Sequence, residues 1–219
     1  MERLRTAGDK VHRGLFNLTS LLSSEYHGKF LRACFEHKHR RPDPWKHEVA
    51  PYETAKYTTT LARIPPRPYR RIADIGCSEG TFTRRVADAY PTAEVVGVDI
   101  SQRALERASR RASAQGLDNV TFTALNIFED SPDGLFDLVF CSELLYYLGG
   151  QERLRTACSR IAALLAPQGL LVAVHPWPES RRLHRPFDSA QRLTQHSEHI
   201  ETATHRPYAV TVYEHGDLP

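Results

Sequence analysis

The chain has 219 residues, 41% of them hydrophobic, and its 29 Lys and Arg residues nearly balance 26 Asp and Glu residues, which gives a net charge of +3. This length and composition allow one α/β domain with a single core plus an extension, and the small net charge does not require nucleic acid as a partner. No apolar run approaches about 18 residues and the N-terminus lacks an apolar segment, which argues against a membrane span and a secretory signal.

Residues 1–66 are expected to be helical and to form an N-terminal cap ahead of the main domain at residues 67–219. Apolar residues recur at helical spacing between residues 15 and 22 and again between residues 30 and 35. Pro42 and Pro44 must interrupt the helical structure, because a proline restricts its own backbone and that of the preceding residue. A further helix is expected at residues 52–63.

From residue 68 the chain alternates between predicted strands and helices. Strands are expected at residues 70–75, 94–98, 120–125, 136–141 and 170–174. Helices are expected at residues 81–89, 102–115, 151–165 and 189–195, and a closing hairpin at residues 200–203 and 208–213. This alternation predicts an α/β fold with a mostly parallel sheet and helices on both faces. Ligands of such sheets lie outside the carboxyl ends of the strands.

The turn after the first predicted strand contains Gly76, Ser78 and Gly80 and leads directly into a helix. Strand, glycine turn and helix in this order are typical of the opening of a nucleotide-binding α/β domain. Bare backbone at Gly76 lets a ligand approach closely. A dinucleotide fingerprint needs a third glycine and a different spacing, so the turn disfavours NAD.

Two acidic residues stand at the ends of adjacent predicted strands. Asp74 precedes the first glycine by two residues, where its carboxylate would repel a pyrophosphate but attract the ammonium group of a methionine tail. Asp99 ends the second strand, and its carboxylate can accept hydrogen bonds from both hydroxyls of a ribose. The pair therefore predicts S-adenosylmethionine as the ligand.

Two other interpretations of the same turn stay open. Residues 76–80 match G-x-S-x-G, the nucleophile elbow of hydrolases, with Ser78 as the nucleophile and Asp137 and His175 following in triad order. No oxyanion segment of the HGGG type precedes this turn, and Asp74 would disfavour an oxyanion nearby. The second is an ordinary strand-to-helix turn without a ligand, which the paired acids disfavour.

The cysteines show no C-x-x-C spacing, so they are expected to be free thiols in a reducing cytoplasm. His37 and His39 lack the companion cysteine pair that would support a metal site, and no metal is expected. The four cysteines are Cys34, Cys77, Cys141 and Cys158.

Four segments resemble the motifs of class I S-adenosylmethionine-dependent methyltransferases: residues 74–80, with Ser78 in place of the middle glycine, and residues 98–104, 134–139 and 167–171. This resemblance implies a Rossmann-like methyltransferase sheet. A closer resemblance, over residues 43–175, is to the nodulation protein S family, through Asp43-Pro44-Trp45 and residues 52–61 and 142–148. Enzymes of that family N-methylate an amino sugar of a chitooligosaccharide.

The resemblance implies a cofactor site in which Asp74 and Gly76 meet the methionine end and Asp99 holds the ribose. The product would be S-adenosylhomocysteine. The residues expected to bind the cofactor are Trp45, Tyr57, Asp74, Gly76, Ser78, Gly80, Asp99, Ile100, Asn126, Ile127 and Ser142.

By the same resemblance, Ile100 and Ile127 would pack on the two faces of the adenine. Asn126 stands where the family usually has an aspartate, and its amide oxygen can accept a hydrogen bond from the adenine amino group. Trp45 and Tyr57 would close over the cofactor, with an aromatic face near the sulfonium cation. Packing within the cap explains these two aromatic residues equally well.

The expected acceptor residues follow strands four and five. His175 is expected to be the general base, because imidazole titrates near neutral pH, although a capping role before Pro176 explains it equally well. Glu143 would orient a cationic amine or take its proton. Tyr147 and Tyr146 would stack on a sugar or aromatic acceptor, with helix packing as the alternative explanation.

Methyl transfer to a small-molecule amine, such as an amino sugar or a natural-product intermediate, is therefore the leading hypothesis. O-methylation of a small molecule comes second, an RNA-directed methyltransferase third, and a hydrolase-like enzyme using Ser78 fourth. We expect a cytoplasmic monomer or homodimer with a small-molecule acceptor and no membrane or nucleic-acid partner.

Overall fold

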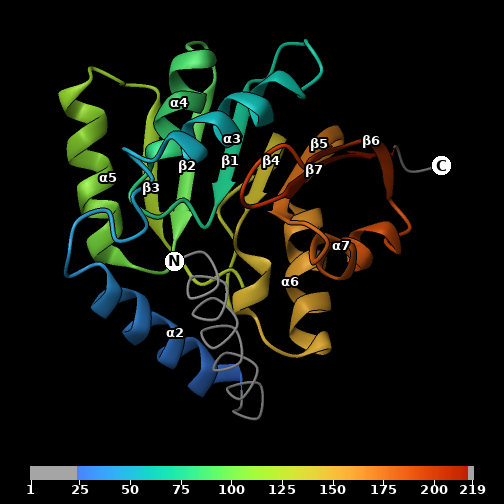
Figure 1. Cartoon of the computed structure of the whole chain (residues 1–219), viewed down its shortest axis with the longest axis horizontal. Coiled ribbons are helices and arrows are strands. Elements are labelled where there is room, and N and C mark those ends of the chain that lie inside the picture. Colours follow the sequence, from blue (N-terminus) through green and yellow to red (C-terminus); the bar gives the residue numbers. More distant parts are fainter. Residues whose placement is uncertain (1–23, 217–219) are drawn as a thin grey trace.

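In the computed structural model, which describes residues 24–216, the chain forms one seven-stranded sheet with helices on both faces (Figure 1). The strands are β1 (Arg71–Ile75), β2 (Glu94–Asp99), β3 (Val120–Ala124), β4 (Phe136–Ser142), β5 (Leu165–Pro176), β6 (Leu193–Glu201) and β7 (Tyr208–His215). Their order in the sheet is β3-β2-β1-β4-β5-β7-β6. Strands β1 to β5 are parallel, and β7 is antiparallel to both β5 and β6. The expected mostly parallel sheet with a closing hairpin is confirmed.

The core consists of two layers, one on each face of this sheet. The helices are α2 (Ser24–Lys38), α3 (Pro51–Ala62), α4 (Thr81–Ala89), α5 (Gln102–Ala114), α6 (Gln151–Ala163) and α7 (Ser180–Asp188), with a 3-10 turn η2 (Leu145–Tyr147). Helices α3 and α4 share a buried apolar cluster with one face of the central strands, and α6 and α7 share one with the other face. Strands β1 and β4 and the second half of β5 are buried at most positions because both faces are covered.

The parallel strands place their carboxyl ends along a single edge of the sheet. Residues from the ends of β1, β2 and β4 therefore come close together, although long stretches of chain separate them. Helix α2 lies at this edge (Figure 1), and its residues Leu31 and Phe35 line the same cavity as the strand ends. This packing places α2 over the carboxyl edge of the sheet.

The helix predicted at residues 189–195 is wrong, because the last helix is α7 and β6 already begins at Leu193. Leu183 and Phe187 stand one helical turn apart on α7, and both are fully buried. Basic residues at positions 181, 182 and 185 surround them, and such a composition is typical of solvated surface. Burial of one narrow apolar stripe outweighs the polar composition of the segment.

The expectation for the cysteines is met. All four cysteines are free thiols. Among residues 24–216, no helix has the length and apolar character to cross a membrane. The apolar stripe expected between residues 15 and 22 lies outside the described residues.

Candidate active site

The glycine turn after β1 is held against the neighbouring strand. The backbone N–H groups of Gly76 and Cys77 both donate to the Val98 carbonyl, at 2.7 and 3.0 Å. Gly76 has a φ of 83° and Ser78 a φ of 52°, so both residues have left-handed backbone conformations. The turn thereby keeps its backbone close to a cavity that both residues line.

Asp99 connects this turn to the start of α5. One carboxylate oxygen accepts from the Ser78 N–H at 2.9 Å and the other from the Ser101 N–H at 2.9 Å. The Ser101 hydroxyl in turn accepts from the Ala104 N–H and caps α5. Burial raises the pKa of Asp99, although these backbone donors favour the charged form. Each carboxylate oxygen keeps a lone pair for a ligand in the cavity.

Asp74 lies at the carboxyl end of β1 and lines the same cavity. It is 3% exposed, and the Thr83 hydroxyl donates to its carboxylate at 2.6 Å. Burial raises the pKa of Asp74 to about 6, partly opposed by that hydrogen bond, and the nearby Asp99 raises it further. A buried carboxylate with this pKa is mostly ionised at neutral pH and can bind a cation. The two acids predicted from the sequence thus share one cavity.

The other wall of the cavity is apolar. Ile100, Leu125, Ile127 and Phe128 line it beyond Asp99, where a flat ring system would lie next to a ribose. Asn126 also lines it, and its amide oxygen accepts from the Phe128 N–H at 3.2 Å. That oxygen has a second lone pair, so the expected acceptor for an adenine amino group remains compatible with this geometry.

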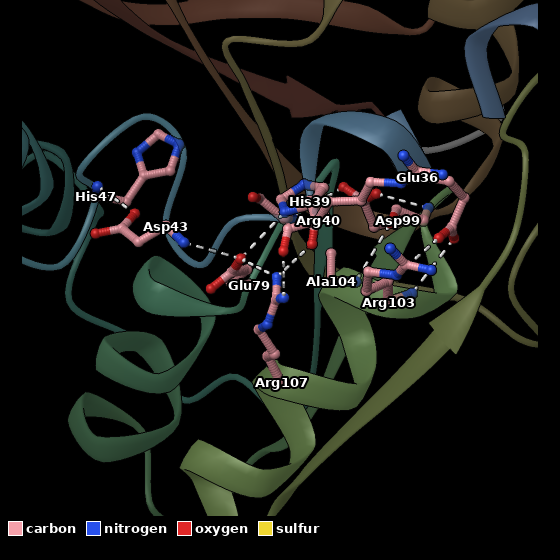
Figure 2. A network of polar contacts seen from close by, with 12 residues as sticks. Glu36, His39, Arg40, Asp43, His47, Glu79, Asp99, Arg103, Ala104 and Arg107 are labelled. Atoms are coloured by element: carbon pink, nitrogen blue, oxygen red, sulfur yellow. Dashed lines mark hydrogen bonds and ion pairs between the residues drawn. The ribbon is translucent and has the colours of Figure 1, made fainter. Parts of the chain in front are cut away.

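The segment between α2 and α3 is anchored to the glycine turn through Glu79 (Figure 2). Glu79 is buried, and one of its oxygens accepts from His39 Nδ1 at 3.1 Å, from the Asp43 N–H at 3.0 Å and from Arg107 at 2.9 Å. Burial would raise the pKa of Glu79, but these donors and Arg111 lower it to about 2. Trp45, carried by this segment, lines the cavity.

Charged residues gather on the side of the cavity towards α3. The Lys56 ammonium lies 3.0 Å from Glu53 and 3.0 Å from Glu143, and the Tyr146 hydroxyl donates to the other oxygen of Glu143 at 2.8 Å. Burial would lower the pKa of Lys56, but the two carboxylates outweigh it and hold the pKa above its ordinary value. Lys56 is therefore a permanent cation. Tyr147 lies beside Tyr146 and also lines the cavity.

His175 does not occupy the position expected of a general base. It is fully buried and is not among the residues that line the cavity. Its Nε2 accepts from the Leu145 N–H at 3.2 Å, and its Nδ1 lies 2.9 Å from His184 Nε2. His184 Nδ1 lies 3.1 Å from the Thr211 hydroxyl, and burial lowers the pKa of His184 to about 4. Through the hydrogen bond from the Leu145 N–H, His175 helps to fix the position of η2, which carries Tyr146.

The hydrolase triad considered from the sequence does not assemble. Ser78 lines the cavity, but His175 is buried against His184. Asp137 lies near the amino end of β4, where it accepts from the Arg70 and Arg71 N–H groups at 2.7 and 3.1 Å. The three side chains therefore lie apart from one another, and neither Asp137 nor His175 can act with Ser78 as a catalytic triad.

Gly80, expected at the cofactor, does not line the cavity. It has a φ of 71°, and a Cβ at this position would lie 2.8 Å from Ala108 Cβ and 2.9 Å from the Phe122 ring. Gly80 instead allows α4 to start in close contact with α5 and β3. Its role is thus in packing, which spacing alone does not distinguish from ligand contact.

Substituting Gly80 with alanine should therefore destabilise the fold by about 3 kcal/mol, through steric overlap plus left-handed backbone strain. Gly116 is a matched control, because it has a φ of 68° and no atom lies within 4 Å of the position that a Cβ would take there. Gly116→Ala should cost only about 1 kcal/mol, the backbone part alone. Urea unfolding measures both, and equal losses would contradict the packing role.

The cavity brings together most of the expected site residues and several that the sequence did not suggest. Of the expected set, all but Gly80 and His175 line it. Without knowledge of the fold, no pattern assigned a role to His47, Glu53, Lys56 or Arg206, which also line it. Glu53 and Lys56 occurred in the family resemblance, but only tertiary packing connects them to Glu143.

A protein-family model described as a methyltransferase domain matches residues 68–213. Among curated proteins, nodulation protein S from Rhizobium tropici is 29% identical over 131 residues, which is 59% of this chain and 53% of that protein. Trans-aconitate 2-methyltransferase from Deinococcus radiodurans is 33% identical over 144 residues, 66% of this chain and 52% of that protein. The matches thus span about half the length of these relatives.

Among solved structures, the N-methyltransferase NodS from Bradyrhizobium japonicum in complex with S-adenosyl-L-homocysteine has a TM-score of 0.72. It is 24% identical, and the match covers 85% of this chain and 98% of that one. The likeness concerns the fold and extends beyond the sheet to most of the chain.

Proposed function

Because the chain belongs to the methyltransferase domain family, as the resemblance in its sequence predicted, we propose that it transfers a methyl group from S-adenosylmethionine to a small-molecule amine. The main observation in support of this donor is that Asp74 and Asp99, from different strands, line one cavity. When bound, the donor supplies a methyl group already activated by a sulfonium. The protein then has mainly to position the donor and the nucleophile.

The residues present fit this donor. Among the described residues, the Ser78 hydroxyl is a buried polar group without a hydrogen-bond partner, and it lies in the turn that lines the cavity. An unpaired buried polar group is costly unless a ligand or water satisfies it. Asp74 would hold the cationic methionine end, Asp99 the ribose hydroxyls, and Ile100 and Ile127 the adenine.

Donor affinity should therefore depend on pH through Asp74, whose pKa is about 6 in the free site. The deprotonated carboxylate attracts the cationic donor, so affinity should be highest near pH 7 and fall about tenfold per pH unit below the pKa of Asp74. Calorimetric titration of the donor at several pH values measures this. Asp74→Asn should bind more weakly and lose most of the pH dependence, and an unchanged slope in that variant would contradict the assignment.

The acceptor side favours an amine. Glu53 and Glu143 flank a single cation, Lys56, so the group as a whole bears a net negative charge that attracts an ammonium. Tyr146 and Tyr147 offer ring faces beside it on which a sugar can pack. An amino sugar or a similar amine fits these features, as the nodulation protein S relatives suggest.

O-methylation of a carboxylate is the second candidate. Arg206 joins Lys56 in lining the cavity, and two cations favour an anionic acceptor. Relatives named for trans-aconitate, a carboxylate, support this candidate.

Incubation with labelled donor and matched acceptors separates the two candidates. Glucosamine, N-acetylglucosamine and a tricarboxylate serve as the set, scored by the mass gain of one methyl group. Methylation of glucosamine but not of its N-acetylated form supports transfer to nitrogen. Methylation of the tricarboxylate alone would support the second candidate instead of the first. Failure to bind the donor would contradict both candidates.

We further propose that residues 1–66 act as a cap over the donor. Support comes from Glu79, which joins His39 and Asp43 of the segment between α2 and α3 to the glycine turn. The enzyme would act in the cytoplasm as a monomer or homodimer, on a small molecule and without a nucleic-acid partner.

A further inference from the structure

We propose that His47 is the general base that takes a proton from the acceptor amine. This inference rests on the proposed function and identifies the residue that performs its proton transfer. His47 lies in the segment between α2 and α3 and lines the cavity together with Asp74 and Glu143.

One edge of the His47 imidazole faces a carboxylate. Its Nδ1 lies 3.5 Å from Glu53 Oε2 and 3.1 Å from the Tyr57 hydroxyl oxygen. Glu53 is buried, and although burial would raise its pKa, His47 and Lys56 lower it to about 2, so it is ionised at neutral pH. The Glu53 carboxylate can only accept a hydrogen bond and the Tyr57 hydroxyl oxygen can also accept one, so we infer the tautomer with the proton on Nδ1. This tautomer leaves the Nε2 lone pair available.

The opposite edge of the ring is open. Among the residues that the structure describes, none makes a hydrogen bond or ion pair with Nε2, and the side chain is 22% exposed. An imidazole whose Nδ1 edge faces a carboxylate, with Nε2 directed away from it, resembles the arrangement that general-base histidines use. The Glu53 charge would also stabilise the imidazolium that forms.

The other candidate bases at the cavity are already engaged. His39 is buried and bonded to Glu79. Both oxygens of Glu143 are occupied, one by Lys56 and the other by the Tyr146 hydroxyl. His175 is outside the cavity, and its Nε2 already accepts from a backbone N–H.

The backbone of His47 is fixed relative to the donor site. Its N–H donates to the Asp43 carboxylate at 2.7 Å, and the Asp43 N–H donates to Glu79 at 3.0 Å. Figure 2 shows this series, with Asp43 between His47 and Glu79. Glu79 directly precedes the last glycine of the turn, so the base and the donor cradle belong to one connected framework.

The proton transfer balances as follows. An acceptor ammonium gives one proton to Nε2 of His47, which becomes imidazolium, and the nitrogen regains its lone pair. That lone pair forms a bond to the methyl carbon of the sulfonium donor as the carbon–sulfur bond breaks, and the electron pair of that bond stays on sulfur. The products are a methylated ammonium and a neutral thioether, and His47 returns its proton to water.

The test compares His47→Gln and His47→Ala with a matched control, His37→Gln, on an exposed position of α2. Both His47 variants should lose about 100-fold in kcat and keep the donor affinity of the wild type in calorimetry. Added imidazole should restore part of the activity of His47→Ala. The control should behave as the wild type.

A second readout does not depend on turnover. The ¹⁵N spectrum of the imidazole in the donor complex should show a protonated Nδ1 and an unprotonated Nε2 above neutral pH. Wild-type kcat in both variants, loss of donor binding together with activity, or a proton on Nε2 would each overturn the assignment. If the wild type binds the donor but methylates no amine, the proposed function is wrong. That result differs from every outcome that would contradict the role of His47 alone.

Discussion

Replacing Asp99 with alanine should weaken S-adenosylmethionine binding by about 100-fold or more, because two charge-assisted hydrogen bonds to the ribose would be lost. The measurement is calorimetric titration of the donor into the purified variant. The expectation follows from the position of Asp99, whose carboxylate lines the cavity and is oriented there by the Ser78 and Ser101 N–H groups.

Asp137→Ala is a matched control for Asp99→Ala. It also accepts two backbone N–H bonds, from Arg70 and Arg71, but lies near the amino end of β4 and does not line the cavity. Asp137→Ala should therefore lose a comparable amount of stability while its donor affinity stays at the wild-type level. If both variants lose affinity equally, the effect of Asp99 is structural, and the donor site lies elsewhere.

Replacing Lys56 with methionine should destabilise the fold by about 3 kcal/mol. The substitution leaves the buried Glu53 and the half-buried Glu143 without their shared cation, and breaking such a group costs more than it contributes when intact. Lys56 is 2% exposed, so solvent cannot replace the lost charge. Chemical denaturation at pH 7 measures the loss.

Two further variants separate charge from packing. Lys46 is exposed and makes no ion pair with any described residue, so Lys46→Met should leave stability nearly unchanged. Adding Glu143→Gln to Lys56→Met should recover part of the loss, because one of the unpaired charges is removed.

In Lys56→Met the pKa values of the Glu53 and Glu143 carboxyls should rise. The loss of stability relative to the wild type should therefore shrink as the pH falls and these groups become protonated. A deficit that is constant with pH would mean that lost packing, not charge, is responsible.

The two histidines give the clearest case of a role that sequence position could not assign. His175 lies at the carboxyl end of β5, where a parallel strand is expected to face the ligand, and the sequence therefore suggested it as the base. Its side chain instead turns into the core towards His184 and Thr211, 9 and 36 residues further along the chain. His47 carried no motif, and its position at the cavity depends on packing of the cap.

The sequence alone determined the fold class and grouped the residues of the proposed donor half of the site. The pattern of apolar residues is local, the parallel order of strands follows from the strand–helix alternation, and parallel strands must end at one edge. Asp74, Gly76, Ser78 and Asp99 lie within a few residues of those strand ends, so adjacency in sequence was enough to bring them together.

Only the tertiary structure brought together the residues of the proposed acceptor half. Lys56 and Glu143 are 87 residues apart, and their contact depends on how α3 packs against the loop after β4. The direction of each side chain at a strand end, into the cavity or into the core, depends on the neighbours that cover it. These neighbours come from segments distant in sequence, and no local pattern records where such segments meet.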